Sequence, residues 1–303
     1  MIRPARELKY ALSRHGLNRT LLVRRLTHEL DHPRLRELRR TALEGTGPKA
    51  RALRFVFARL ERGILRVPTG RGAGLIMDMS YIPISHAHAG ALASGNLESS
   101  VQEALVRHLA PGDVMYDIGA NLGFFALVAA RLVAAEQGRV YAFEPAPDNV
   151  EAIRRNAELN LLPNIAVIPR AVSSRAGTAR LQIVDDQSWS KLEEYGEHPA
   201  TERVIEVETV TIDELLRAGE LPPPGLVKID VEGAELAVLE GMRATLDEHR
   251  PVIVCELHGT HEGFAAAMAA HSYRIVNLEG PAPIAEDPDS HHALGLPPLD
   301  PGD

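Results

Sequence analysis

The sequence predicts an α/β fold in which a mostly parallel sheet is covered by helices on both faces. From about residue 113 onward, short apolar runs alternate with longer stretches of helical spacing, which is typical of strand–helix–strand units. The run Val114–Ile118 is followed by a turn that contains Gly119 and Gly123, and then by a helix-like stretch. In an open parallel sheet such a turn lies at the carboxyl end of a strand, where ligands bind.

The N-terminal part of the chain is expected to be mostly helical. Leucines recur at helical spacing within 1–66, and a proline and a Gly-Thr-Gly-Pro cluster separate the helices. A short strand pair is expected across 64–84, with three glycines in its turn, and a helix at 99–109 follows it.

The alternating part of the chain supplies the predicted sheet and its covering helices. Strands are expected at 113–118, 139–143, 164–168, 226–230, 251–257 and 273–278. Helices are expected at 122–135, 147–160, 211–217, 233–247 and 262–271. A β-rich insertion spans about 171–210, and the tail from about 281 to 303, rich in proline and aspartate, is expected to be irregular apart from one edge strand.

Charge is distributed unevenly along the chain. Residues 1–66 carry 17 lysines and arginines against 6 acidic residues, whereas the remainder carries 16 against 35, so a formal net charge of −8 conceals a basic arm on an acidic body. Such an arm can bind nucleic acid or an anionic membrane surface. It lacks interleaved aromatic residues for base stacking, so we expect no nucleic-acid partner. Packing on the acidic body is favoured, and a homodimer through these helices stays open.

Composition places the chain among globular enzymes. Hydrophobic residues make up 45% and charged residues 24% of its 303 residues, which is ordinary for a globular domain. We expect no transmembrane segment, because no apolar run approaches the roughly 18 residues that one requires. The N-terminus lacks the apolar core of a signal peptide, and the single cysteine, Cys255, excludes an internal disulfide. A cytoplasmic location is the simplest expectation.

The glycine turn and the next strand end form a candidate nucleotide site. Gly119 and Gly123 are expected to let the backbone approach a ligand where a Cβ would clash. Asp117 closes the first strand and Glu144 closes the second. A carboxylate at the second strand end commonly accepts hydrogen bonds from both ribose hydroxyls. These features fit a dinucleotide and S-adenosylmethionine alike.

Three details of this region favour S-adenosylmethionine. Asn121 stands where the dinucleotide motif Gly-x-Gly-x-x-Gly has the glycine that admits the pyrophosphate. Asp117 would repel a pyrophosphate, but it suits the cationic amino group of a methionine moiety. Pro145 rigidly ends the strand beside the ribose position. The alternative function is that of a nicotinamide-dependent oxidoreductase. The alternative without a function is a strand–turn–helix connection that binds no ligand.

Two later strands carry acidic residues and a histidine to the same edge of the sheet. Asp230 is a candidate for the group that lines a methyl-transfer site, and Glu232 either joins it or caps the following helix. Lys228 is expected to pair with a nearby carboxylate. Glu256 and His258 follow the next strand, and a histidine can act as a general base near neutral pH.

These motifs together resemble the FkbM family of S-adenosylmethionine-dependent methyltransferases. The likeness covers about 95–278 and rests on Asp117-Ile118-Gly119-Ala120-Asn121-Leu122-Gly123, Phe143-Glu144-Pro145, Asn156, Asn160, Lys228-Ile229-Asp230-Val231-Glu232-Gly233 and Glu256-Leu257-His258. The resemblance implies a class I methyltransferase (Rossmann-like) fold, with a seven-stranded sheet whose last strand is antiparallel. It also implies O-methylation of a hydroxyl on a natural product or glycan. The methyltransferase domain would span 67–280, and the basic extension 1–66 lies outside the family pattern.

The resemblance also implies roles for individual residues. The methionine part of the donor would be surrounded by Asp117, Gly119, Asn121 and Gly123. Glu144, followed by Pro145, would hold the ribose. Ala171 and Val172 would lie near the adenine, and Glu98 would face the donor. Asp230, His258 and Glu256 would line the methyl-transfer site.

The acceptor site is expected in two loops, 81–97 and 185–199. The candidate acceptor-site residues in these loops are Tyr81, His86, His88, Asp185, Asp186, Trp189 and Tyr195. The two histidines or the two aspartates could hold a metal ion, but neither pair has a full ligand set, so we expect no metal. A nucleic-acid methyltransferase that uses the basic arm is a further alternative. The chain lacks the Asn-Pro-Pro-Tyr type of loop expected for base methylation, because that strand end reads Asp230-Val231-Glu232-Gly233.

Overall fold

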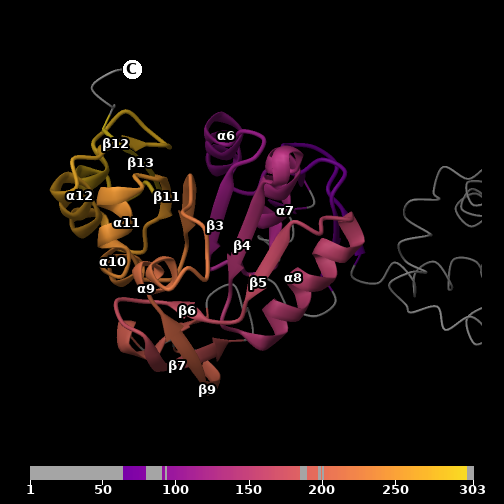
Figure 1. Cartoon of the computed structure of the whole chain (residues 1–303), viewed down its shortest axis with the longest axis horizontal. Helices are drawn as coiled ribbons and strands as arrows, with labels where there is room; N and C mark the ends of the chain where they lie inside the picture. Colours follow the sequence, from indigo (N-terminus) through magenta and orange to yellow (C-terminus); the bar gives the residue numbers. More distant parts are fainter. Residues whose placement is uncertain are drawn as a thin grey trace, which may run out of the picture.

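The computed structural model describes residues 64–79, 91–92, 94–184, 190–196, 199 and 201–298 (Figure 1). The helices predicted before residue 63, and with them the expected dimer contact, lie outside this part of the chain. Two larger units stand out within it, a seven-stranded sheet flanked by helices and a four-stranded sheet.

The seven-stranded sheet confirms the predicted class I methyltransferase architecture. Its strands are β3 (Val114–Ile118), β4 (Arg139–Phe143), β5 (Ile165–Ile168), β10 (Leu226–Ile229), β11 (Val252–Glu256), β12 (Arg274–Asn277) and β13 (His292–Leu296). They lie in the order β12-β13-β11-β10-β3-β4-β5, and β13 is antiparallel to both of its neighbours. The edge position predicted for the strand of the tail was wrong, because β13 is inserted between β11 and β12. There both of its backbone edges are hydrogen-bonded.

Helices cover both faces of this sheet, as predicted. One face carries α6 (Ser99–His108), α7 (Phe124–Val133) and α8 (Pro147–Asn160), and the other carries α9 (Ile212–Arg217), α10 (Glu235–Glu240), α11 (Arg243–Glu248) and α12 (His261–Ala270). Because successive side chains of a strand point to opposite faces, Met115 of β3 joins the first apolar layer and Tyr116 the second. Short 3-10 turns lie at Ala135–Gln137, Glu193–Tyr195 and Ile284–Glu286.

The single helix expected over 233–247 is two helices, α10 and α11. Gly241 separates them, and a Cβ built on it would lie 2.1 Å from the carbonyl oxygen of Ser173. The break therefore reflects a close backbone contact with a distant segment, which no local helical pattern reports.

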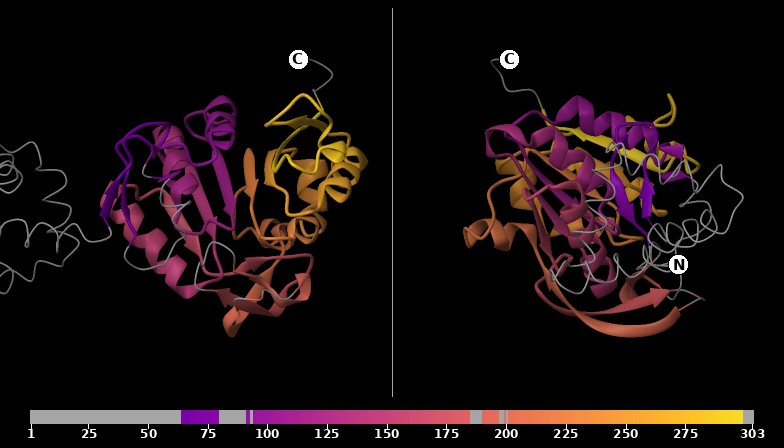
Figure 2. Two further views of the ribbon diagram at one scale, coloured as in Figure 1. Left: turned by 180° about the vertical axis from the view of Figure 1, so that it is seen from behind. Right: turned by 90° about the vertical axis from the view of Figure 1, so that its right-hand side faces the viewer.

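The β-rich insertion forms the second sheet. Its strands are β6 (Ala171–Val172), β7 (Gly177–Val184), β8 (Lys191–Leu192) and β9 (Thr201–Val210), in the order β6-β9-β7-β8. In Figures 1 and 2 this sheet forms a separate layer below the carboxyl ends of the main strands. This position lets the smaller sheet form one side of a ligand site at the carboxyl ends of the larger sheet.

A hairpin made of β1 (Ile64–Arg66) and β2 (Ile76–Asp78) confirms the predicted strand pair and packs against α8. Asn156 is fully buried; its Oδ1 accepts a hydrogen bond from the Asp78 amide at 2.6 Å, and its side-chain amide donates to the Leu122 carbonyl at 3.0 Å. Arg155 pairs with the buried Asp78 carboxylate at 3.4 Å. One helix face thus anchors both the hairpin and the turn after β3.

We predict that Asn156→Ala lowers the free energy of unfolding by about 2–4 kcal/mol, because it leaves two buried backbone groups without partners. Urea unfolding followed by circular dichroism measures the change. Glu151→Ala, at an exposed position of the same helix, is the control and should change stability little. Equal stability of the two variants would contradict the anchoring role of Asn156.

Candidate functional site

A cavity opens where the carboxyl ends of β3, β4 and β10 meet the smaller sheet. The predicted donor-site residues that line it are Gly119, Asn121, Glu144, Pro145, Ala171, Val172 and Asp230. Three other predicted donor-site residues, Glu98, Asp117 and Gly123, do not line it. Ser190, Lys191 and Leu192 also line the cavity, and they belong to the loop 185–199 that was predicted for the acceptor. Sequence reasoning missed Asn149 of α8 and Arg170, which precedes β6, because no motif marked them.

The turn after β3 uses its glycines differently from the prediction. Gly119 has φ +79°, and a Cβ on it would lie 1.7 Å from the carbonyl oxygen of Asp230. Gly123 has φ +81°, and its missing Cβ faces Ile153 at 3.1 Å. The space that each glycine leaves is therefore occupied by the protein itself, and the expected clearance for a ligand is not the reason for glycine here.

Glu144 connects the second strand end to this turn. One of its carboxylate oxygens accepts the Asn121 amide and the other accepts the Ala146 amide, each at 2.9 Å. The residue is 5% exposed. Burial raises the pKa of Glu144 to about 7, although these amides favour the charged form. The carboxylate is thus fixed in direction at the wall of the cavity.

Asp117 lies inside β3, on the face covered by α7, and is fully buried. Neither carboxylate oxygen has a hydrogen-bond partner of ordinary geometry within the described part of the chain. Burial raises the pKa of Asp117 to about 6, and the nearby Lys228 ammonium opposes that shift. A buried carboxylate with unused acceptor capacity is a marker of a functional site.

Lys228 pairs with carboxylates, as the sequence suggested. Its ammonium lies 3.0 Å from Asp230 Oδ2, 3.9 Å from Asp117 Oδ1 and 4.8 Å from the centre of the Phe125 ring. Burial disfavours the charged ammonium, but Asp230 and Asp117 outweigh burial and raise the pKa of Lys228. This single buried ammonium therefore bridges the acidic residues of two neighbouring strands.

His258 lies at the centre of an acidic cluster beside Asp230. Its Nδ1 is 2.9 Å from Glu235, and its Nε2 is 3.5 Å from Glu232 and 3.6 Å from Glu256. Burial lowers the pKa of His258, but Glu235 and Glu232 reverse that effect and raise it to about 9. Burial also raises the pKa of Glu232 to about 7.

The alternative capping role of Glu232 is not seen. Glu235 instead accepts the Gly233 amide at 2.8 Å, while Glu232 faces His258. The structure thus brings the predicted residues Asp230, Glu256 and His258 together, and it adds Glu232 and Glu235 to them.

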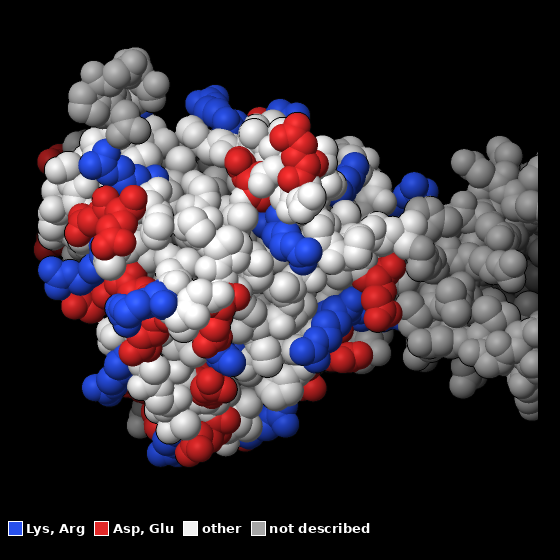
Figure 3. All heavy atoms as spheres, viewed as in Figure 1, with Lys and Arg blue, Asp and Glu red and all other residues white. Residues whose placement is uncertain are grey.

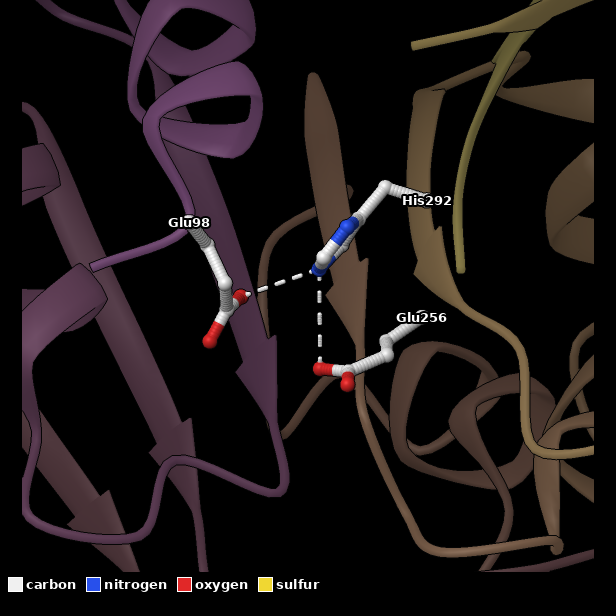
Figure 4. Close-up of side chains that lie close together, drawn as sticks. All are labelled: Glu98, Glu256 and His292. Atoms are coloured by element: carbon white, nitrogen blue, oxygen red, sulfur yellow. Dashed lines mark ion pairs between the residues drawn. The ribbon is translucent and has the colours of Figure 1, made fainter. Parts of the chain in front are cut away.

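A second histidine, His292, shares Glu256 with the first and was missed by the sequence analysis. Its Nε2 lies 3.3 Å from Glu98 and 3.7 Å from Glu256 (Figure 4). Its Nδ1 lies 2.5 Å from Glu279. Burial lowers the pKa of His292, but the surrounding carboxylates raise it to about 10. The sole signal in the sequence was a histidine pair before a short apolar run in the tail.

Most residues of the predicted acceptor loops, from Tyr81 to His88 and from Asp185 to Trp189, lie outside the described residues. Tyr195 is described and lies at the end of a 3-10 turn near Gly233. On the face shown in Figure 3, basic and acidic side chains are interspersed across the described part of the chain. That face lacks the basic stripe that binds a phosphate backbone.

Comparison with known proteins gives a consistent set of relatives. Residues 117–281, more than half of the chain, match the family model described as "Methyltransferase FkbM domain". The hexuronic acid methyltransferase AglP of Haloferax volcanii is 33% identical over 163 residues, which are 53% of this chain and 62% of that protein. The chain therefore spans less than two thirds of this relative.

A further relative and a solved structure match different shares of this chain. The 31-O-demethyl-FK506 methyltransferase FkbM of Streptomyces tacrolimicus is 28% identical over 65% of this chain and 88% of its own length. The crystal structure of methyltransferase FkbM from Methylobacillus flagellatus KT aligns with 86% of this chain and 59% of its own, at a TM-score of 0.43 and 16% identity. Within the described residues, no helix is long and apolar enough to cross a bilayer.

The raised pKa of His258 predicts a pH dependence of stability. A histidine whose pKa rises on folding stabilises the native state fully below its unfolded pKa of about 6.5, and this contribution is lost as pH rises through about 9. The charges that face it are Asp230, Glu232, Glu235 and Glu256.

We therefore expect the free energy of unfolding to fall between pH 7 and 9, and His258→Gln to remove about 2 kcal/mol of that fall. Urea unfolding at several pH values measures it, with the exposed His249→Gln as the matched variant. Parallel pH profiles for wild type and His258→Gln would refute the assigned charge on His258.

Proposed function

The chain belongs to the FkbM methyltransferase family, and from this premise we propose that it transfers a methyl group from S-adenosylmethionine to a hydroxyl of a natural product or glycan. The observation that carries the proposal is the single cavity into which Gly119, Glu144 and Asp230 all face. These residues come from three neighbouring parallel strands, at the edge where such sheets bind their ligands.

The polar groups of the site fit this donor better than a dinucleotide. Asp117, Asn121 and Asn149 each contribute a buried oxygen without a hydrogen-bond partner among the described residues. Carboxylates and amide oxygens accept hydrogen bonds from an ammonium and from ribose hydroxyls. The nearest arginine of the cavity, Arg170, is paired with Glu208 and Glu220, so it is a weak candidate for a pyrophosphate partner.

We assign the donor-binding residues from the family resemblance, although Asp117, Gly123 and Glu98 do not line the cavity. Glu144 would accept the ribose hydroxyls, and Ala171 with Val172 would contact the adenine. The methionine part would be held by Asp117, Gly119, Asn121 and Gly123, with Pro145 ending the strand and Glu98 facing the donor. S-adenosylmethionine, when bound, supplies an electrophilic methyl group on a cationic sulfonium, which suits this acidic surrounding.

The proposed proton-accepting group consists of Asp230 as the proton acceptor, with His258 and Glu256 beside it. Since the pKa of His258 is raised to about 9, its imidazole is protonated near neutral pH and does not act as the base that the sequence suggested. Asp230 faces the cavity, and its ligand atoms lie within 4.8 Å of those of Glu232 and His258. A hydroxyl that binds beside Asp230 can pass its proton to this carboxylate. His258 and Glu256 then balance the charge, and the cavity wall excludes water and aligns the hydroxyl.

Two classes of acceptor are supported by the relatives. One relative is named for a hexuronic acid and the other for a demethylated FK506, and both are oxygen-rich molecules. The acidic cluster at His258 favours an acceptor that is neutral at the reacting oxygen. We therefore propose a hydroxyl acceptor on a glycan or on a natural product.

Isothermal titration with S-adenosylhomocysteine tests donor binding. We expect saturable binding by the wild type and about 10- to 100-fold weaker binding by Glu144→Gln, because a hydrogen bond to a charged group contributes about 1.5–3 kcal/mol. Glu151→Gln, exposed on α8, should bind like the wild type. Absence of binding by the wild type, or saturable binding of NADH instead, would overturn the donor assignment.

Methyl transfer from a radiolabelled donor to hexuronate glycosides and hydroxylated macrolides tests the proton-accepting group. We expect Asp230→Asn to lower kcat about 100- to 10,000-fold, the usual contribution of a general base. Its affinity for S-adenosylhomocysteine should stay within about threefold of the wild type. An unchanged kcat would remove Asp230 from this role.

A further inference from the structure

We propose that Glu98, Glu256 and His292 form a binding site for one divalent transition-metal cation. Glu98 precedes α6, Glu256 ends β11 and His292 begins β13 (Figure 4). One ligand atom from each residue lies within 4.8 Å of the other two. Cation binding here does not require the methyl donor, although Glu98 is also proposed to face the donor, and no motif in the sequence marked His292.

The imidazole of His292 is buried and directed into this cluster. The residue is 6% exposed, and its Nε2 makes no hydrogen bond within the described part of the chain. Glu98 Oε2, which it faces, is also buried without a hydrogen-bond partner there. These two atoms face each other at 3.3 Å as an ion pair that lacks hydrogen-bond geometry. A cation bound by both atoms could replace the proton between them.

The other ring nitrogen of His292 shows which species fits. Nδ1 lies 2.5 Å from Glu279 Oε1, so it donates its proton to that carboxylate. The raised pKa of His292 keeps a second proton on Nε2 in the absence of a metal ion. A bound cation would displace that proton and use the Nε2 lone pair together with two carboxylate oxygens. A carboxylate that orients a histidine through Nδ1 is the usual outer partner of a metal ligand.

The separations of the three atoms agree with a shared cation. His292 Nε2 lies 3.3 Å from Glu98 Oε2 and 3.7 Å from Glu256 Oε2. Ligands bound at about 2.1 Å are separated by about 3.0–3.4 Å in octahedral or tetrahedral arrangements. Small side-chain adjustments would therefore bring all three atoms to bonding distance.

The sheet holds two of the ligands rigidly. Glu256 and His292 are directly paired positions of the antiparallel strands β11 and β13, so their side chains lie on the same face of the sheet. Two carboxylates neutralise a divalent charge. One nitrogen and two oxygens suit Mn²⁺, Fe²⁺, Co²⁺ or Zn²⁺ better than Mg²⁺ or Ca²⁺, which prefer oxygen alone.

The site lies next to the proposed proton-accepting group, because the other oxygen of Glu256 faces His258 at 3.6 Å. Three protein ligands leave coordination positions open for water or for an oxygen of the acceptor. A cation here is placed to polarise an acceptor hydroxyl as a Lewis acid.

Titration of the full chain with MnCl₂ tests the site, after treatment with EDTA, buffer exchange and without any methyl donor. Electron paramagnetic resonance of free Mn²⁺ measures the bound fraction. We expect one saturable site per chain. Loss of a residue that only orients a metal ligand lowers metal affinity by about 10- to 100-fold. Glu98→Gln and His292→Gln each remove a direct ligand, so each should weaken Mn²⁺ binding by about 100-fold. Glu103→Gln, exposed on α6, should bind Mn²⁺ like the wild type.

Thermal unfolding of the same proteins provides a second measurement. Saturating Mn²⁺ should raise the Tm of the wild type and of Glu103→Gln but not that of Glu98→Gln. The proposal is overturned if neither Mn²⁺ nor Zn²⁺ binds the wild type below about 1 mM, or if Glu98→Gln binds normally. It is also overturned if Glu232→Gln alone abolishes binding, which would place the cation at His258. None of these outcomes affects donor binding, which S-adenosylhomocysteine reports separately.

Discussion

A single buried ammonium organises the carboxyl edge of the main sheet. Lys228 is 3% exposed and lies between Asp230 and Asp117. An isolated buried charge of either sign would be strongly destabilising, so Lys228 and Asp117 can be buried only together, and Asp230, whose side chain is 22% exposed, supplies the second carboxylate. Because Lys228 and Asp117 are paired positions of β10 and β3, the ion pairs also determine where each carboxylate points. The donor turn and the proton-accepting group both depend on this arrangement.

Carboxylates outnumber cationic groups around Lys228, and two histidines compensate for part of the excess negative charge. His258 and His292 share Glu256 through their Nε2 atoms, and each is held at Nδ1 by another carboxylate, Glu235 or Glu279. The edge therefore attracts cationic groups in general. The proposed sulfonium donor and the proposed divalent cation would both be favoured by this electrostatic character, at positions defined by different strands.

Much of the fold could be predicted from the sequence because its signals are local. The bounds of α8, from Pro147 to Asn160, and of β4 agree with the prediction, since a proline at the helix start and a short apolar run are read within a few residues. The strand-end carboxylates were found because parallel strands end at one edge. His292 was missed because β13 reaches the site by pairing with β11, a long-range contact that a short run in a polar tail does not reveal.

The glycines of the turn after β3 are required for a different reason from the one that the motif suggested. Glycine was expected at position 119 because a Cβ there would clash with a ligand. The atom that would lie against such a Cβ is instead the Asp230 carbonyl oxygen. The turn after β3 and the end of β10 therefore pack backbone against backbone, and the Asp230 amide donates to the Ile118 carbonyl at 3.0 Å. A side chain at 119 would push these strand ends apart. The donor turn and Asp230 are consequently one rigid unit, so binding at one is coupled geometrically to alignment at the other.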